Sequence, residues 1–163
     1  MSLDIMNAFP SLIQKQAVDE IQECNDFTVK FGLTLSRQDA IELVETRNLS
    51  LKKYGRVEFG GGVINKIIKE FCDSPYISMN NYVGTLHELI EIFYFYKNET
   101  LDLISDDELI KFMKNSFDGK CQGSIELLSE RELAKMARNL RYGYAPDYSE
   151  DSGCEEEDED DQY

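Results

Sequence analysis

The sequence predicts an all-α protein: a single-domain bundle of about six helices around one central, aromatic-rich helix. Three observations lead to this prediction. Several stretches repeat apolar residues at helical spacing, the residues before them suit helix N-termini, and glycines follow them. The stretch Met79–Glu99, MNNYVGTLHELIEIFYFYKNE, is the most apolar and is apolar around most of its circumference. Such a helix needs neighbours on most sides, which places it at the centre of the bundle.

The central helix, over residues 79–99, is predicted from one continuous apolar stripe. The residues of the stripe follow helical spacing and are Tyr82, Leu86, Leu89, Phe93 and Tyr96. Ile92 and Phe95 extend the apolar surface around the far side. A strand over IEIFYFYK is the alternative, because Ile, Phe and Tyr favour strands. The length of the stretch, and the lack of other clearly alternating segments, favour the helix.

Two helices are predicted in the first third of the chain. The first spans residues 11–31, with Phe31 as its last inward residue, and ends at Gly32, a residue type that closes many helices. The second begins after Ser36, where Asp39 completes a capping box, and ends at Gly55.

The remaining helices are predicted from their boundary residues. A helix over residues 62–72 follows three glycines, and Ser78 or Asn80 is then expected to cap the central helix. Further on, SDDE at 105–108 is a capping box for a helix that Gly119 closes. After a short helical turn at 125–128, SERE at 129–132 is a second capping box, for a last helix that ends near residues 142–143.

The composition is that of an ordinary globular domain with an acidic end. The chain has 163 residues, 42% of them hydrophobic, and contains no membrane-length apolar run and no secretory leader, so we expect a cytoplasmic protein without membrane contact. Ten of the 32 acidic residues and no basic residue lie from Asp147 onward, which leaves 22 acidic and 17 basic residues before it, a net charge of −5. This balance gives no reason to expect general nucleic-acid binding. We predict a loose N-terminus over 1–10, a helical domain over 11–143 and a disordered acidic tail over 144–163.

The cysteines and the single histidine do not form a metal motif. The four cysteines are far apart, and the sequence HELIE has Glu91 where a zinc-protease motif needs a second histidine. We therefore predict no metal site and no cofactor. Cys24 and Cys72 are expected to be buried, Cys121 lies in a glycine-flanked loop that would allow an exposed thiol, and His87 is expected to pair with an acid on a polar face.

Several unusual strings occur in one order along the chain. They are LVETRN at 43–48, GRVEFGGG at 55–62, FCDSPYI at 71–77, FYFYKNETLD at 93–102, and DDEL with FDGKCQGS over 106–124. Through these strings, the segment from about residue 32 to 141 resembles an uncharacterised bacterial family, a domain of unknown function. The resemblance implies a small, mostly helical cytoplasmic protein. It brings no activity, cofactor or catalytic residue.

The glycine run before a helix is the strongest candidate for a ligand site. Backbone N–H groups at a helix N-terminus bind anions, and glycine permits their close approach. This run and the loop KNETLD would together form one polar pocket, whose candidate ligand-binding residues are Arg56, Glu58, Gly60, Gly61, Gly62, Lys97, Asn98, Glu99 and Asp102. FGGGVINK lacks the spacing of a P-loop or a dinucleotide fingerprint. A tight connection between packed helices, beside surface salt bridges, is therefore the favoured interpretation.

Three functions are compatible with these features. We favour a non-catalytic interaction or structural module that binds a protein partner or forms a homo-oligomer, because no catalytic set converges and aromatic residues are abundant. The alternative is an enzyme or small-ligand or anion-binding protein that uses the candidate residues. A second alternative is nucleic-acid binding, regulated by the acidic tail, through a basic stripe on the last helix made of Arg131, Lys135, Arg138 and Arg141. A solvated face is the simpler interpretation of that stripe.

Overall fold

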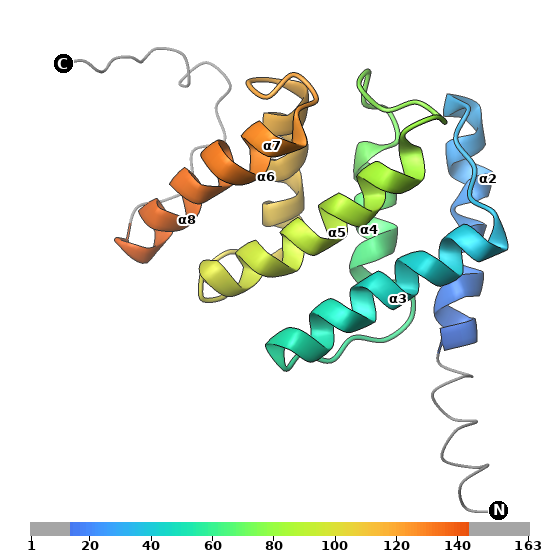
Figure 1. Ribbon diagram of the computed structural model, residues 1–163, viewed down its shortest axis with the longest axis horizontal. Coiled ribbons are helices and arrows are strands. Elements are labelled where there is room, and N and C mark those ends of the chain that lie inside the picture. The colour runs from blue at the N-terminus through green and yellow to red at the C-terminus, as the bar shows by residue number, and fades with distance from the viewer. Residues whose placement is uncertain (1–13, 144–163) are drawn as a thin grey trace, which may run out of the picture.

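The computed structural model describes residues 14–143, which form helices and loops with no strand among them (Figure 1). A first helix occupies residues 14–23. The elements that follow are α2 (Asn25–Thr28), η1 (Val29–Phe31), α3 (Arg37–Tyr54), α4 (Gly62–Phe71), α5 (Tyr82–Glu99), α6 (Asp106–Asp118), α7 (Ile125–Leu127), the π-helical η2 (Leu128–Leu133) and α8 (Ala134–Arg141). The all-α prediction is confirmed. The predicted loose N-terminus, the start of the first helix and the acidic tail lie outside the described residues.

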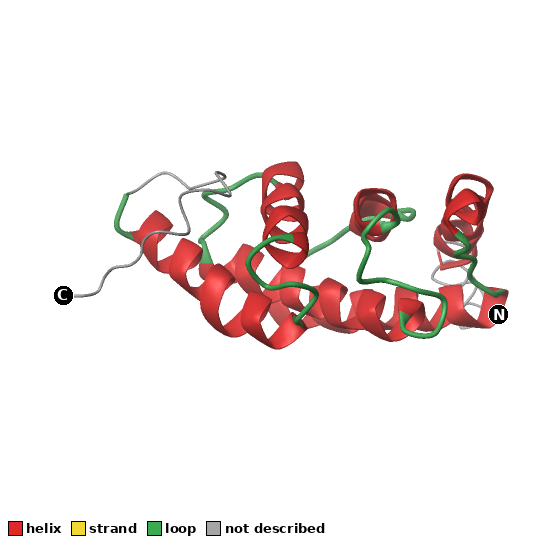
Figure 2. Ribbon diagram, turned by 90° about the horizontal axis from the view of Figure 1, so that it is seen from above, coloured by secondary structure: helices red, strands yellow, loops and turns green. Residues whose placement is uncertain are grey.

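The helices lie in two layers, best seen by comparing Figures 1 and 2. One layer holds the first helix with α2, then α4, then α6; the other holds α3, then α5, then the continuous α7–η2–α8. The chain alternates between the layers, so the described residues form three helix pairs that stack side by side. Within a layer, α2 packs on α4 and α4 on α6, while α3 packs on α5 and α5 on α8. This is the arrangement of a short helical array.

Helix α5 has neighbours on most sides, as its composition predicts. It contacts α3, α4, α6, α7 and α8, and its predicted stripe is buried throughout: Tyr82, Leu86, Leu89, Phe93 and Tyr96. Phe95, on the far side, is 43% exposed. The helix begins at Tyr82 and not at Met79, and neither Ser78 nor Asn80 caps it. Instead, the Asn81 side chain accepts the Ser78 N–H and donates to the Tyr76 carbonyl, which fixes the preceding turn.

The predicted capping boxes at Ser36 and Ser105 and the predicted helix stops at Gly32, Gly55 and Gly119 are confirmed. The Ser36 and Ser105 side chains each accept the backbone N–H three residues on, and the acid there bonds back to the cap N–H. Gly32 and Gly55 close their helices in the left-handed conformation, at φ 79° and 67°. That conformation strains any residue with a Cβ.

The first predicted helix is wrong in its continuity. A turn at Cys24, whose N–H donates to the Ile21 carbonyl, separates residues 14–23 from α2. Beyond the turn, the Asn25 side chain pairs with both the N–H and the carbonyl of Leu35 and so holds the chain against a loop that follows η1. Phe31, the last predicted inward residue, is 42% exposed and does not face inward.

The second predicted capping box, at Ser129, does not form. Ser124 is the cap instead: its hydroxyl accepts the Leu127 N–H, and the helix then runs through η2 into α8 without a new start. Ser129 lies inside this helix, where its carbonyl accepts the Tyr96 hydroxyl at 2.5 Å. Across residues 14–143, no helix is both long and apolar enough to cross a membrane.

Candidate functional site

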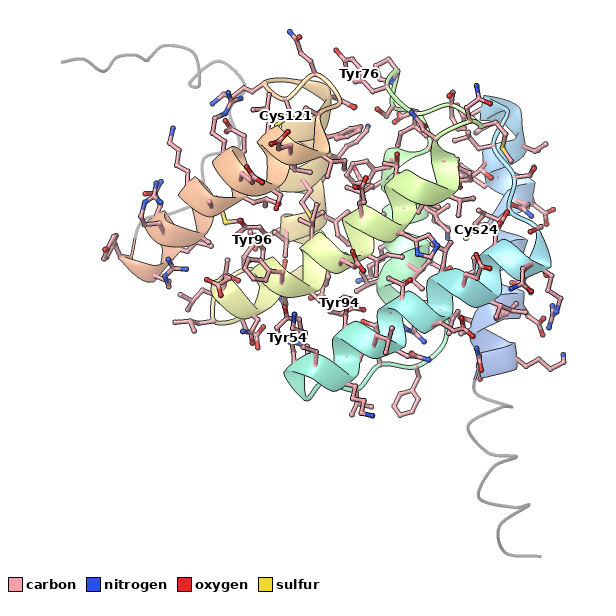
Figure 3. All side chains as sticks on the ribbon, in the orientation of Figure 1. Cys24, Tyr54, Tyr76, Tyr94, Tyr96 and Cys121 are labelled. Atoms are coloured by element: carbon pink, nitrogen blue, oxygen red, sulfur yellow. The ribbon has the colours of Figure 1, made fainter. Side chains whose placement is uncertain are left out.

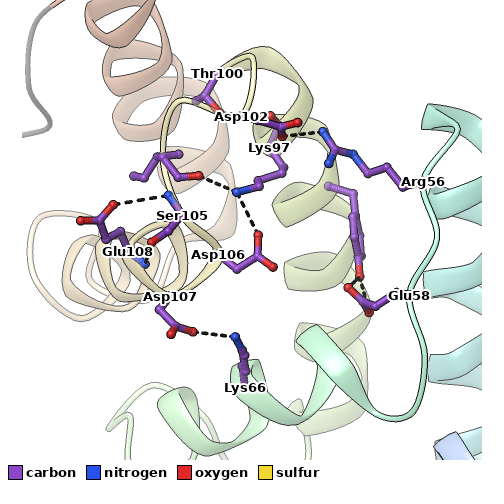
Figure 4. A network of polar contacts seen from close by, with 12 residues as sticks. Arg56, Glu58, Lys66, Lys97, Thr100, Asp102, Ser105, Asp106, Asp107 and Glu108 are labelled. Atoms are coloured by element: carbon purple, nitrogen blue, oxygen red, sulfur yellow. Dashed lines mark hydrogen bonds and ion pairs between the residues drawn. The ribbon is translucent and has the colours of Figure 1, made fainter.

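The two segments predicted to form a pocket meet at one ion pair. Arg56, just after α3, holds Asp102, in the turn after α5, with 2.8 Å between Nη2 and Oδ1 (Figure 4). Asp102 adopts a positive φ of 59°, which bends the chain tightly beyond the end of α5. The Asp102 side chain is 54% exposed. The structure therefore brings the segments together at the surface and not around an enclosed cavity.

Glu58 belongs to a separate, more buried cluster. Its Oε1 lies 3.2 Å from Nη1 of Arg47, whose side chain is only 2% exposed, and both its carboxylate oxygens lie 2.8 Å from the Tyr94 hydroxyl. Arg47 also donates to the Gly60 carbonyl at 2.6 Å. Burial, together with the adjacent Glu58 carboxylate, raises the pKa of Tyr94 well above its ordinary value, so Tyr94 is a hydrogen-bond donor at all physiological pH values. The cluster joins α3, α5 and the chain entering α4.

The glycine run is an anion site that the protein's own carboxylates occupy. The N–H of Gly61 donates to Glu20 Oε1 at 2.7 Å, and the N–H of Val63 donates to Glu58 Oε1 at 3.3 Å. A Cβ at Gly60 would stand 2.6 Å from Glu20 Oε1, and one at Gly62 would stand 2.6 Å from Glu58 Oε1. The glycines thus let two carboxylates approach the N-terminus of α4, where its dipole favours negative charge.

The remaining residues of KNETLD point to other partners. Lys97 pairs with Asp106 at 2.9 Å and donates to the Ile104 carbonyl, which ties the end of α5 to the start of α6 (Figure 4). Glu99 lies 3.5 Å from Arg141 of α8. Asn98 is exposed. Of the nine residues proposed from the sequence, the structure brings only Arg56 and Asp102 together across the two segments. That these residues bind a ligand stays a prediction.

Three other features singled out in the sequence have specific neighbours. His87 bonds through Nδ1 to the Thr46 hydroxyl at 2.7 Å, so its hydrogen-bond partner is not the acid that the sequence suggested. Cys121 is buried, and burial raises its pKa to about 11, so it is not an exposed reactive thiol. Among residues 14–143, no group of three or more His, Cys, Asp and Glu side chains is placed to hold a metal ion.

The basic stripe of the last helix is partly neutralised by acidic neighbours. Arg131 pairs with Glu132 at 2.8 Å, and Arg141 with Glu99. Lys135 and Arg138 are exposed and form no ion pair with another residue of the described range.

A groove between α3 and α5 is a further surface feature, one that the sequence did not indicate. Its volume is about 510 Å³, and Ser129, in η2, contributes to its lining. Helix α3 lines it with Thr46, Leu49, Ser50, Lys53 and Tyr54, and helix α5 with Glu91, Ile92 and Phe95. Figure 3 shows Tyr54 at the C-terminal end of α3. We call this feature the α3–α5 groove.

Two exposed apolar side chains stand at this groove. Leu49 is 70% exposed and Phe95 is 43% exposed, while Ile92 and Tyr54 are half-buried beneath them. Exposed apolar side chains that gather beside a groove are typical of a binding surface. The sequence signal for it is Leu49, an apolar residue off the inward stripe of its own helix.

The charges around the groove are ordered along its length. Helices α3 and α5 run in the same direction (Figure 1), so their N-terminal halves lie at the same end of the groove. The exposed acids Glu45, Glu88 and Glu91 lie in or near that half, and Lys53 lies at the other end. None of these four residues forms an ion pair with another residue of the described part of the chain. Of these four residues, Glu91 and Lys53 line the groove itself, so it carries one unpaired acid and one unpaired base beside its apolar residues.

Comparison with known proteins adds a family but no activity. A family model described as a family of unknown function (DUF6323) matches residues 20–146. No curated protein and no solved structure matches the chain.

Proposed function

Because the chain belongs to DUF6323, a family of unknown function, we propose a function from its geometry: a protein-interaction module without catalytic activity. Its binding surface is the α3–α5 groove, and its ligand is a helix of a partner protein. The observation that carries the proposal is the pair of exposed apolar side chains, Leu49 and Phe95, on either wall of an open groove. A helix laid in an apolar groove is a common mode of peptide recognition.

The chemistry of the groove describes the ligand helix. An apolar side chain would sit between Leu49 and Phe95, where it removes both from water. A basic residue on one side of it would face Glu91, and an acidic residue on the other side would face Lys53. The ligand is thus an amphipathic helix with an apolar residue flanked by opposite charges.

We assign a structural role to the polar clusters of the protein and take the α3–α5 groove as its binding surface. Arg47, Glu58 and Tyr94 satisfy one another, and Glu20 and Glu58 fill the N-terminus of α4. Buried polar groups that are paired in this way stabilise a fold and make it rigid.

Photo-crosslinking in the cell that naturally makes the protein tests the proposal. A benzophenone amino acid in place of Phe95 should form a discrete adduct with a protein. The matched control carries the same amino acid in place of Phe59, which is 70% exposed but outside the groove. A Leu49→Glu change should remove the adduct formed from position 95. Equal adducts from both positions, or none from position 95, would overturn the proposal.

A further inference from the structure

We infer that the helix bound in the α3–α5 groove is α3 of a second copy of this chain, in a two-fold symmetric dimer. The inference rests on the proposed function and names its partner. Along the outer row of α3, Glu45, Leu49 and Lys53 follow one another at four-residue spacing, all exposed. Residues four apart lie on one line of a helix. Along this line an apolar residue stands between an acidic and a basic residue. The ligand helix proposed for the groove has the same pattern.

Two copies of this pattern are complementary when the helices that carry them run in opposite directions. In a two-fold dimer whose axis passes beside Leu49 and across the helix, the two copies of α3 are antiparallel. Glu45 lies as far from Leu49 on one side as Lys53 does on the other. Glu45 of each copy therefore faces Lys53 of the other, and the two Leu49 side chains meet near the axis. A two-fold interface requires this kind of self-complementary surface.

The apolar contacts of the dimer also come from groups that the single chain leaves in water. Leu49 of one copy enters the other copy's groove against Ile92 and Phe95. Leu49 and Phe95 are exposed in the single chain, at 70% and 43%. The area of both side chains that is still exposed in the single chain is buried only on association, and this burial stabilises the dimer.

The inference is tested with charge reversals on the purified full-length chain, by sedimentation equilibrium over about three decades of concentration. The unchanged chain should show a concentration-dependent monomer–dimer equilibrium. Glu45→Lys alone or Lys53→Glu alone places two like-charge contacts in the symmetric dimer and should weaken it about tenfold or more. The double variant restores opposite charges and should recover most of the lost affinity. Lys111→Glu, an exposed position on α6 away from the groove, makes the same change in net charge as Lys53→Glu and should have no effect.

A second variant separates association from folding. Leu49→Ser should abolish the dimer while leaving the urea midpoint of the dilute monomer unchanged, because substitutions of exposed surface residues have small effects on stability. A chain that stays monomeric over the whole range overturns the inference, as does a dimer that Leu49→Ser does not weaken or that the double reversal does not restore. If the chain is monomeric and Phe95 crosslinks to a different protein, the inference fails and the proposed function stands. If the chain is monomeric and no adduct forms, both fail.

Discussion

The Tyr94 hydroxyl lies 2.8 Å from both carboxylate oxygens of Glu58, while Nη1 of Arg47 approaches one of those oxygens at 3.2 Å. Two donors from two helices thus hold one carboxylate that comes from a loop. Tyr94 is on α5, Arg47 is on α3, and Glu58 precedes α4. The relationship fixes the loop between α3 and α4 against both helices, and it leaves the Glu58 carboxylate close enough to accept the Val63 N–H.

Tyr94→Phe should lower the free energy of unfolding by about 1.5–3 kcal/mol, because the lost hydrogen bond is made to a charged and partly buried acceptor. Urea titration followed by circular dichroism measures this change. The matched control is Tyr54→Phe. Tyr54 is half-buried, and within residues 14–143 its hydroxyl makes no hydrogen bond, so its loss should cost less than about 0.5 kcal/mol. Equal effects in the two variants would show that the Glu58 contact does not stabilise the fold.

Phe93→Ala should cost about 3–5 kcal/mol of stability, because Phe93 is 1% exposed in the core and its removal leaves a cavity. Phe95→Ala, two residues along the same helix, removes a side chain that is 43% exposed. We expect it to cost no more than about 1 kcal/mol. Denaturant titration of both variants at low protein concentration makes the comparison. A cost below about 1 kcal/mol for Phe93→Ala would mean that α5 does not pack as described.

Ser105→Ala should destabilise the protein by about 0.5–2 kcal/mol, because the hydroxyl caps α6 by accepting the Glu108 N–H. Ser129→Ala makes the same chemical change in the same sequence context, a serine followed three residues later by Glu132. Since Ser129 lies inside a continuous helix and caps nothing, its replacement should change stability by less than about 0.5 kcal/mol. Thermal unfolding of the two variants in parallel distinguishes the real cap from the apparent one.

Raising the pH into the alkaline range should lower the free energy of unfolding through the Cys121 thiol. Burial raises the pKa of this thiol from its ordinary 9.0 to about 11, so between these values the unfolded chain loses a proton that the folded chain keeps. The contribution is fully present below pH 9 and is lost as the pH rises through 11, at up to about 1.4 kcal/mol per pH unit. Cys121→Ala should therefore show a shallower fall in stability than the parent over this range, measured by urea titration at several pH values. Parallel pH profiles would contradict the assignment.

The features predicted correctly from the sequence are those that neighbouring residues determine. Ser36 and Ser105 cap their helices through residues three positions away, and the stripe of α5 follows from the helical period alone. The Ser129 box has the same local pattern as the Ser105 box. It fails because a helix that started earlier, at Ser124, already supplies its backbone partners.

The features that the sequence did not reveal depend on partners far apart in the chain. Glu20 reaches Gly61, 41 residues away, and Thr46 reaches His87 across the same separation. The α3–α5 groove is of this kind too, because it exists only once two helices lie side by side. Within one helix, Leu49 is merely an apolar residue on a polar face, and periodicity assigns it no role.

The stacking of helix pairs determines which helices can unfold locally while the others stay packed. Helices α2 and α3 pack on α4 and α5, and α6 and α8 pack on α4 and α5 from the other side. In such a one-dimensional order, either outer pair can detach while the middle pair keeps its remaining neighbours. Amide protons should then exchange with solvent in a gradient, fastest in the terminal helices and slowest in α5. The α3–α5 groove lies where two of these helix pairs meet. A ligand bound in it therefore also holds the two pairs together.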